Sequence, residues 1–161
     1  MQTFMMGEYA ATLPEDRLFV ASHMYALPID ESFESVLDSP QTKRTLRFGL
    51  TSYAVRLLQD VYFLEFENDP PVDLAQRQQI GSIESKKAES DLYSPVAGRM
   101  LRINTQLLDD PSLINADTYG EGWMMEIETT DTSQLLDLAG YLEHLEQAWV
   151  VAQRTIKGQM A

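Results

Sequence analysis

The sequence contains no cysteine among its 161 residues. The chain can therefore form no disulfide, no thiolate nucleophile and no zinc–thiolate site. It holds only two histidines, His23 and His144, which leaves little for a His-rich metal site or a Ser-His-Asp triad. If the protein takes part in redox or group-transfer chemistry, the reactive group has to be supplied by something attached to it.

Basic residues are also few. Acidic residues outnumber them by 25 to 12, which gives a formal net charge of −13. Nucleic acids and anionic membranes both attract clustered lysine and arginine, so we expect neither as a partner. No stretch of about 20 apolar residues is present, which argues against a membrane-spanning helix. The first 17 residues include Glu8, Glu15 and Asp16 and a single arginine, unlike a signal or transit peptide. A cytoplasmic protein is the expectation.

Hydrophobic residues make up 44% of the chain, enough for a packed core. Leu46, Phe48 and Leu50 alternate with Arg47 and Gly49, which is the pattern of a half-buried strand. Alternation, β-branched residues and aromatics predict strands at 46–50, 61–66, 80–85, 96–103 and 123–127.

The segments before and between these strands are predicted to be helical or irregular. Residues 51–59 predict a short helix that Thr51 or Ser52 can cap. Residues 1–26 are expected to be irregular. Residues 27–42 hold two prolines and four acidic residues, which is typical of a surface excursion with one helical turn.

Lysine is scarce and unevenly placed. Only four lysines are present, and two of them, Lys86 and Lys87, are adjacent. They begin a polar segment, 86–91, between the predicted strands at 80–85 and 96–103. Because short polar segments between strands are typical of hairpin or loop tips, we expect both lysines at an exposed tip.

A change of period marks the C-terminus. Apolar residues recur there at alternating spacings of three and four, which predicts a helix over 133–157. The members of this seam are Leu135, Leu138, Leu142, Leu145, Trp149, Ala152 and Ile156. Three heptads are marginal for an independent coiled coil, so the helix is expected to pack against something else. It packs either on its own domain or on a partner or second copy.

Four segments within residues 46–128, in the same order, resemble the H-protein family of the glycine cleavage system and its lipoyl-carrier relatives. The first two are RFGLTSYA at 47–54 and QDVYFLE at 59–65, where the family has forms close to VGITxxA and GDIVFVE. The third is GSIESKKAESDLYSPVAG at 81–98, close to GxVESVKAASDLYAPVSG. The fourth is LIN at 113–115 followed by YGEGW at 119–123, similar to LVN and YGxGW. Four motifs in the right order make the resemblance specific.

The resemblance implies a fold and a modification site. The family fold is a mostly β barrel-sandwich hybrid, here with short helices and a long C-terminal helix. The family's lipoylated lysine falls on Lys87 and not on Lys86, because Glu84 and Ser85 precede it at the family's spacing and Ala88 follows it. Glu84 and Ser85 are then candidate contacts of the acylating enzyme or of the cofactor.

The resemblance also covers His23 and the division of the chain. His23, in SHMY at 22–25, matches the family's H-x-W element, with Tyr25 in place of tryptophan. It is implied to form a wall of the groove that receives the loaded arm, and a packing histidine is the alternative. We expect 1–130 to be an H-protein-like lipoyl domain with an atypical N-terminal arm and the 27–42 excursion. Residues 131–161 are then a C-terminal helix packed on the domain or on a partner.

The implied function is that of a carrier and not of an enzyme. Lipoate in amide linkage to Lys87 would supply the dithiol that a chain without cysteine lacks, and would act as a swinging arm in glycine catabolism. In the family, the arm accepts an aminomethyl group from glycine decarboxylase (P), aminomethyltransferase (T) removes it, and dihydrolipoyl dehydrogenase (L) reoxidises the dithiol. A lipoate ligase or lipoyl transferase attaches the cofactor. No catalytic residue and no metal site is expected in the chain itself.

Other functions fit parts of the pattern. An H-like lipoate-binding carrier could serve another pathway, such as sulfur oxidation with partners like heterodisulfide reductase. An unmodified interaction domain would keep the fold without the arm. A biotin carrier is less favoured, because those proteins usually flank the lysine with methionine, whereas Lys86 and Ala88 flank Lys87. Lipoyl domains of 2-oxoacid dehydrogenases lack the YGEGW segment.

Overall fold

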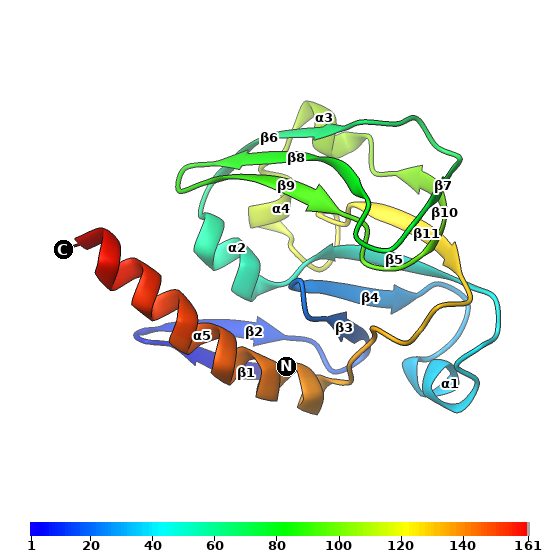
Figure 1. Ribbon diagram of the computed structural model, residues 1–161, viewed down its shortest axis with the longest axis horizontal. Coiled ribbons are helices and arrows are strands. Elements are labelled where there is room, and N and C mark those ends of the chain that lie inside the picture. The colour runs from blue at the N-terminus through cyan, green and yellow to red at the C-terminus, as the bar shows by residue number, and fades with distance from the viewer. Residues whose placement is uncertain (161) are drawn as a thin grey trace.

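Two antiparallel sheets share one core in a barrel-sandwich hybrid, which confirms the predicted mostly β fold class (Figure 1). The computed structural model describes the backbone of residues 1–160 and the side chains of residues 1–154. The larger sheet has six strands in the order β3 (Leu18–Val20), β4 (Met24–Pro28), β5 (Arg44–Leu50), β11 (Met125–Thr129), β10 (Gly98–Ile103) and β7 (Val72–Leu74). The smaller sheet has three in the order β6 (Val61–Phe66), β8 (Gln79–Ser85) and β9 (Glu89–Tyr93).

The core takes its side chains from both sheets. Leu46 and Phe48 of β5 are fully buried while Arg47 between them is half-buried, as their alternation predicted. Ile80 and Ile83 of β8 belong to the same buried cluster. Burial of one such side chain stabilises the fold by roughly 1.5–3 kcal/mol, so the shared cluster holds the two sheets together.

The strands with strong apolar alternation lie close to where they were predicted. Those at 46–50, 61–66 and 80–85 are confirmed as β5, β6 and β8. The helix predicted at 51–59 is α2 (Ser52–Leu58), and the Thr51 hydroxyl caps it by accepting from the Ala54 N–H. The last strand, β11, begins two residues later than predicted, because Trp123 still belongs to the preceding turn and donates its N–H to the Gly120 carbonyl.

The prediction that residues 1–26 are irregular is wrong. They form β1 (Gln2–Met6), β2 (Tyr9–Leu13), β3 and most of β4. The β1–β2 hairpin is largely exposed, and β3 and β4 are almost continuously buried. Neither burial pattern produces clear alternation in the sequence, because alternation requires one buried and one solvated face. The 27–42 excursion includes α1 (Phe33–Asp38), which the Ser32 hydroxyl caps.

The hairpin that carries the two adjacent lysines differs from the predicted one in its second strand. β8 pairs with β9, so the tip is only residues 86–88 and not 86–91. The predicted partner strand at 96–103 is β10, which pairs with β11 and β7 in the larger sheet. β9 was missed because four of its five residues are exposed, so it has no apolar face of its own. Its ladder to β8 holds it in place.

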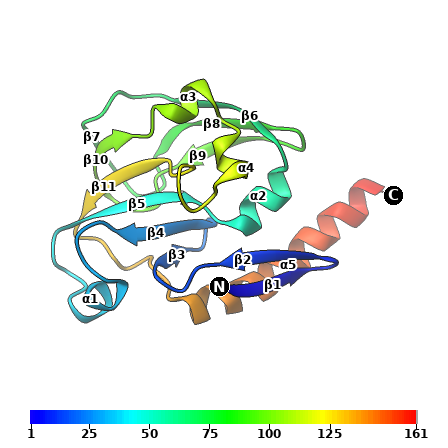
Figure 2. The same ribbon diagram turned by 180° about the vertical axis from the view of Figure 1, so that it is seen from behind.

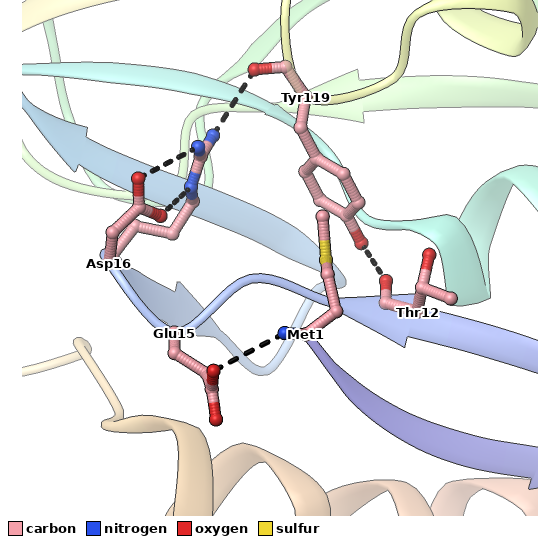
Figure 3. A network of polar contacts seen from close by, with 6 residues as sticks. Met1, Thr12, Glu15, Asp16 and Tyr119 are labelled. Atoms are coloured by element: carbon pink, nitrogen blue, oxygen red, sulfur yellow. Dashed lines mark hydrogen bonds and ion pairs between the residues drawn. The ribbon is translucent and has the colours of Figure 1, made fainter.

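The β1–β2 hairpin and α5 (Leu138–Met160) lie together on one side of the body (Figures 1 and 2). A second buried cluster joins them to β3, β4 and α2, with Met6, Leu13, Phe19, Tyr25, Tyr53, Tyr141 and Leu145 among its members. Polar contacts add to this attachment (Figure 3). The Tyr119 hydroxyl donates to the Thr12 carbonyl of β2, and the N-terminal ammonium group pairs with Glu15 at 3.2 Å.

Helix α5 begins five residues later than the predicted helix at 133–157. Leu136 instead forms a β-bridge with Phe19, in which each backbone N–H donates to the other's carbonyl, at 2.7 and 2.9 Å. The buried stripe of α5 includes Tyr141, which the heptad pattern missed. Of the predicted seam, Leu145 is buried, and Leu138, Leu142 and Trp149 pack on the second cluster. The side chain of Ile156 lies outside the described residues.

Two short helices, α3 (Gln106–Asp109) and α4 (Leu113–Ala116), connect β10 to β11. Within the part of the chain that the structure describes, no helix is both long and apolar enough to cross a membrane.

Candidate functional site

Lys87 lies at the tip of the β8–β9 hairpin with an exposed side chain. Residues 85–88 form the closing turn, in which the Ser85 N–H donates to the Ala88 carbonyl at 2.8 Å. The Ser85 hydroxyl donates to the same carbonyl at 3.1 Å and accepts from the Ala88 N–H at 3.2 Å. The buried Ser85 side chain therefore fixes the shape of the turn on which Lys86 and Lys87 stand.

The turn is also anchored to the segment that follows α2. The Lys86 N–H donates to the Asp60 carbonyl at 2.9 Å, and the Lys87 N–H donates to the Leu58 carbonyl at 3.3 Å. Both lysine amides are thus satisfied by the main chain of another element, while both side chains are exposed. A group attached to either lysine would move on a fixed base.

Asn115, at the end of α4, holds the same segment in place from its other side. Its Nδ2 donates to the Gln59 carbonyl at 2.7 Å, and its Oδ1 accepts from the Val61 N–H at 2.9 Å. Gln59 has a left-handed backbone, φ 61°, and ends α2. The paired contacts of Asn115 stabilise this tight exit from the helix. The LIN motif was recognised from the sequence, but nothing there indicated that its asparagine supports the lysine turn.

A groove runs beside the hairpin between α2, β9 and the β3–β4 turn. Its volume is about 260 Å³, just below the roughly 300–1,000 Å³ of ordinary small-ligand sites. Its apolar walls include Met24, Leu50, Leu57, Leu58, Ile83 and Leu92. Leu58 both lines the groove and accepts the Lys87 N–H, so the lysine stands at one end of the groove.

Glu84 lies near the tip but not in this groove. Ile83 points into the groove, and successive side chains of a strand point to opposite faces, so Glu84 faces the other side of the smaller sheet. There it is half-buried, opposite Glu89 of β9. Of the predicted site residues, His23 lines the groove, and the backbone of Lys87 contacts the groove residue Leu58. Ser85 shapes the turn, and Glu84 lies outside the groove.

His23 forms part of the groove wall from the β3–β4 turn. Its backbone is left-handed, with φ 69°, a conformation that is uncommon outside glycine, although asparagine, aspartate and histidine adopt it more often than other residues. Two backbone bonds hold it there: its N–H donates to the Val20 carbonyl, and its own carbonyl accepts from the Thr51 N–H, both at 3.0 Å. The turn therefore fixes the imidazole against the start of α2.

The imidazole of His23 is half-buried among aromatic side chains. Its ring centroid lies 4.7 Å from that of Tyr53 and 5.6 Å from that of His144. Its Nδ1 lies 2.9 Å from the hydroxyl of Tyr141 on α5. Burial, together with the nearby His144, lowers the pKa of His23 from 6.5 to about 4. His23 is therefore uncharged at neutral pH.

Comparisons with known proteins find relatives of one family. The family model described as "Glycine cleavage H-protein" matches residues 36–150, which include the lysine turn and the first half of α5. A protein named "Glycine cleavage system H protein" from Mycolicibacterium vanbaalenii is 40% identical over 107 residues, 63% of this chain and 81% of the relative. One of the same name from Methylacidiphilum infernorum is 36% identical over 139 residues, 83% of this chain and 96% of the relative.

A solved structure is also similar. The crystal structure of a glycine cleavage system H protein from Mycobacterium marinum matches with a TM-score of 0.66 at 30% sequence identity. The match covers 84% of this chain and 98% of that one.

Proposed function

Because the chain belongs to the glycine cleavage H-protein family, we propose that it is a lipoyl carrier with Lys87 as its attachment site. The attached lipoyl group supplies the dithiol chemistry through which an aminomethyl group is taken up and passed on. The protein contributes position and surroundings. It is a carrier component of a multi-enzyme system and not a catalyst.

The observation that carries this proposal is the combination of an exposed lysine with an immobilised backbone. An acylating enzyme needs access to the amine, and Lys87 provides it from a solvent-exposed tip. A carrier also needs a base that does not move with the arm, and the bonds from Lys86 and Lys87 to Asp60 and Leu58 provide it. Tethering on such a base keeps the carried group at high effective concentration near the next enzyme.

The groove beside the hairpin fits the attached group in chemistry and in reach. Ser90 to Leu92 line the groove and lie roughly 10–17 Å from Lys87 along β9, at about 3.4 Å per residue. A lysine side chain lengthened by an eight-carbon chain has about 13 bonds near 1.5 Å and, at roughly 1.25 Å of advance per bond, spans about 16 Å when extended. The apolar walls suit its methylenes and sulfurs, and His23 places one polar ring beside them.

The remaining predicted site residues receive supporting roles in this proposal. Ser85 shapes the turn through its bonds to Ala88. Glu84, on the face away from the groove, is available to the enzyme that acylates Lys87. The proposed partners are those of the family: glycine decarboxylase, aminomethyltransferase, dihydrolipoyl dehydrogenase, and a lipoate ligase or lipoyl transferase.

Intact mass tests the attachment. The chain is coexpressed with a lipoate ligase in the presence of lipoate, together with Lys87→Arg and Lys86→Arg as matched variants. We expect one lipoyl increment on the wild type and on Lys86→Arg, mapped to Lys87 by peptide analysis, and none on Lys87→Arg. A wild type without the increment, or an increment on Lys86, contradicts the proposal.

Exchange of labelled bicarbonate into glycine tests the pathway. The lipoylated chain is mixed with glycine decarboxylase, and exchange is measured against the unlipoylated chain and Lys87→Arg. Exchange that depends on lipoylated Lys87 supports the aminomethyl carrier. A fully lipoylated chain that supports no exchange contradicts that pathway while leaving lipoyl attachment in place.

A further inference from the structure

A side chain from the C-terminal helix contacts the groove histidine. Tyr141, fully buried in the first turn of α5, places its hydroxyl 2.9 Å from His23 Nδ1 and 2.8 Å from Thr51 Oγ1. The three groups form a chain that runs from the cap of α2, through α5, to the groove wall.

The direction of these hydrogen bonds follows from the buried threonine. Thr51 is completely buried, and its Oγ1 already accepts from the Ala54 N–H at 3.5 Å. Among the described residues, the Tyr141 oxygen is the only acceptor recorded for the Thr51 hydroxyl hydrogen. A buried donor without an acceptor is costly, so Thr51 donates to Tyr141. Tyr141 must then direct its own hydrogen to His23 Nδ1.

This order fixes the proton on the imidazole. Because Nδ1 accepts a hydrogen bond, a neutral His23 carries its proton on Nε2. Within the described part of the chain, Nε2 has no hydrogen-bond partner, and His23 lines the groove. A proton on Nδ1 would leave either the Thr51 or the Tyr141 hydroxyl hydrogen without an acceptor among the described residues.

We propose that Tyr141 is a positioning residue that, with Thr51, holds the proton of the His23 imidazole on Nε2, so that the groove offers one N–H donor to the arm. This inference rests on the proposed function in that the ligand of the groove is the lipoyl-lysine arm. The acceptors on that arm are the amide oxygen and the sulfurs, none of which carries a charge. A neutral donor suits them, and an imidazolium would place an unpaired charge in an apolar groove.

Tyr53 provides a matched control. Its ring packs on the same imidazole at 4.7 Å, but no hydrogen bond joins its hydroxyl to His23. Tyr53→Phe and Tyr141→Phe therefore remove the same atom from two rings around one histidine. Only the second removes a bond to Nδ1.

The proton position is measured on the unmodified chain, by long-range ¹H–¹⁵N correlation of labelled histidine at pH 7. We expect the wild type and Tyr53→Phe to show His23 with a protonated Nε2 and an unprotonated Nδ1. In Tyr141→Phe the two nitrogen shifts should move toward each other, because the constraint on the tautomer is lost. A wild-type His23 protonated on Nδ1, or a Tyr141→Phe spectrum equal to the wild type, overturns the proposal.

Docking of the arm is measured on the lipoylated proteins through amide shifts of Leu57 and Leu92, which line the groove. Tyr141→Phe should weaken docking about two-fold relative to Tyr53→Phe, because only about half of the His23 population would then carry its proton on Nε2. Equal docking in the two variants overturns the role of the donor. If intact mass shows no lipoyl group on Lys87, the proposed function fails, whereas the tautomer measurement still decides the role of Tyr141.

Discussion

His23 makes the stability of this protein depend on pH between about pH 4 and pH 7. Its folded pKa of about 4, set by burial and by His144, lies below the unfolded value of 6.5. Between these values the unfolded chain binds a proton that the folded chain excludes, so the free energy of unfolding falls as the pH falls. The difference is negligible above pH 7, reaches about 2 kcal/mol at pH 5, and approaches its full value of about 3 kcal/mol near pH 4.

The matched variant is His23→Asn. Asparagine tolerates the left-handed backbone at this position, φ 69°, and does not titrate. Urea unfolding followed by tryptophan fluorescence at pH 7 and pH 5 gives the free energy of unfolding of both proteins. From pH 7 to pH 5 the wild type should lose about 2 kcal/mol more than His23→Asn. Equal losses would refute the reasoning, because the carboxylates common to both proteins cancel in the comparison.

Two further pairs of substitutions test the packing of the fold. Gly81→Ala should lower the free energy of unfolding by more than about 2 kcal/mol, because a Cβ on β8 would overlap the Glu65 carbonyl oxygen of β6. Gly140→Ala, whose Cβ would lie 3.2 Å from an Asp137 carboxylate oxygen and 3.7 Å from the Leu136 side chain, should change it by less than about 1 kcal/mol. Equal effects of the two glycine substitutions would contradict the packing argument. Leu46→Ala should cost about 2–5 kcal/mol, whereas Leu37→Ala, at a side chain 48% exposed, should stay within about 0.5 kcal/mol. Urea unfolding midpoints at constant m-value measure both pairs.

The local sequence pattern was sufficient to predict the strands and helices that have one buried and one solvated face. β5 and α2 follow directly from the alternation of Leu46 and Phe48 and from the cap at Thr51. The exposed lysine turn also followed from the sequence, because polar residues between two strands leave few other structures. β9 and the β1–β2 hairpin could not be predicted from the sequence. They are held by pairing with neighbouring strands and by packing on α5, and such tertiary contacts leave no signal in the local sequence.

The sequence by itself indicated which lysine to consider, since the family's spacing from Glu84 and Ser85 favours Lys87 over Lys86, and it showed that the chain has no thiol of its own. Tertiary structure alone decided what surrounds that lysine. His23 and Tyr141 are 118 residues apart, and no periodicity relates residues at such a separation. Whether they meet depends on how α5 packs against the body. The position of the proton on His23 in the groove wall depends on the same packing. A local pattern specifies a strand or a turn, but a hydrogen bond between distant elements exists only once the whole core has placed them.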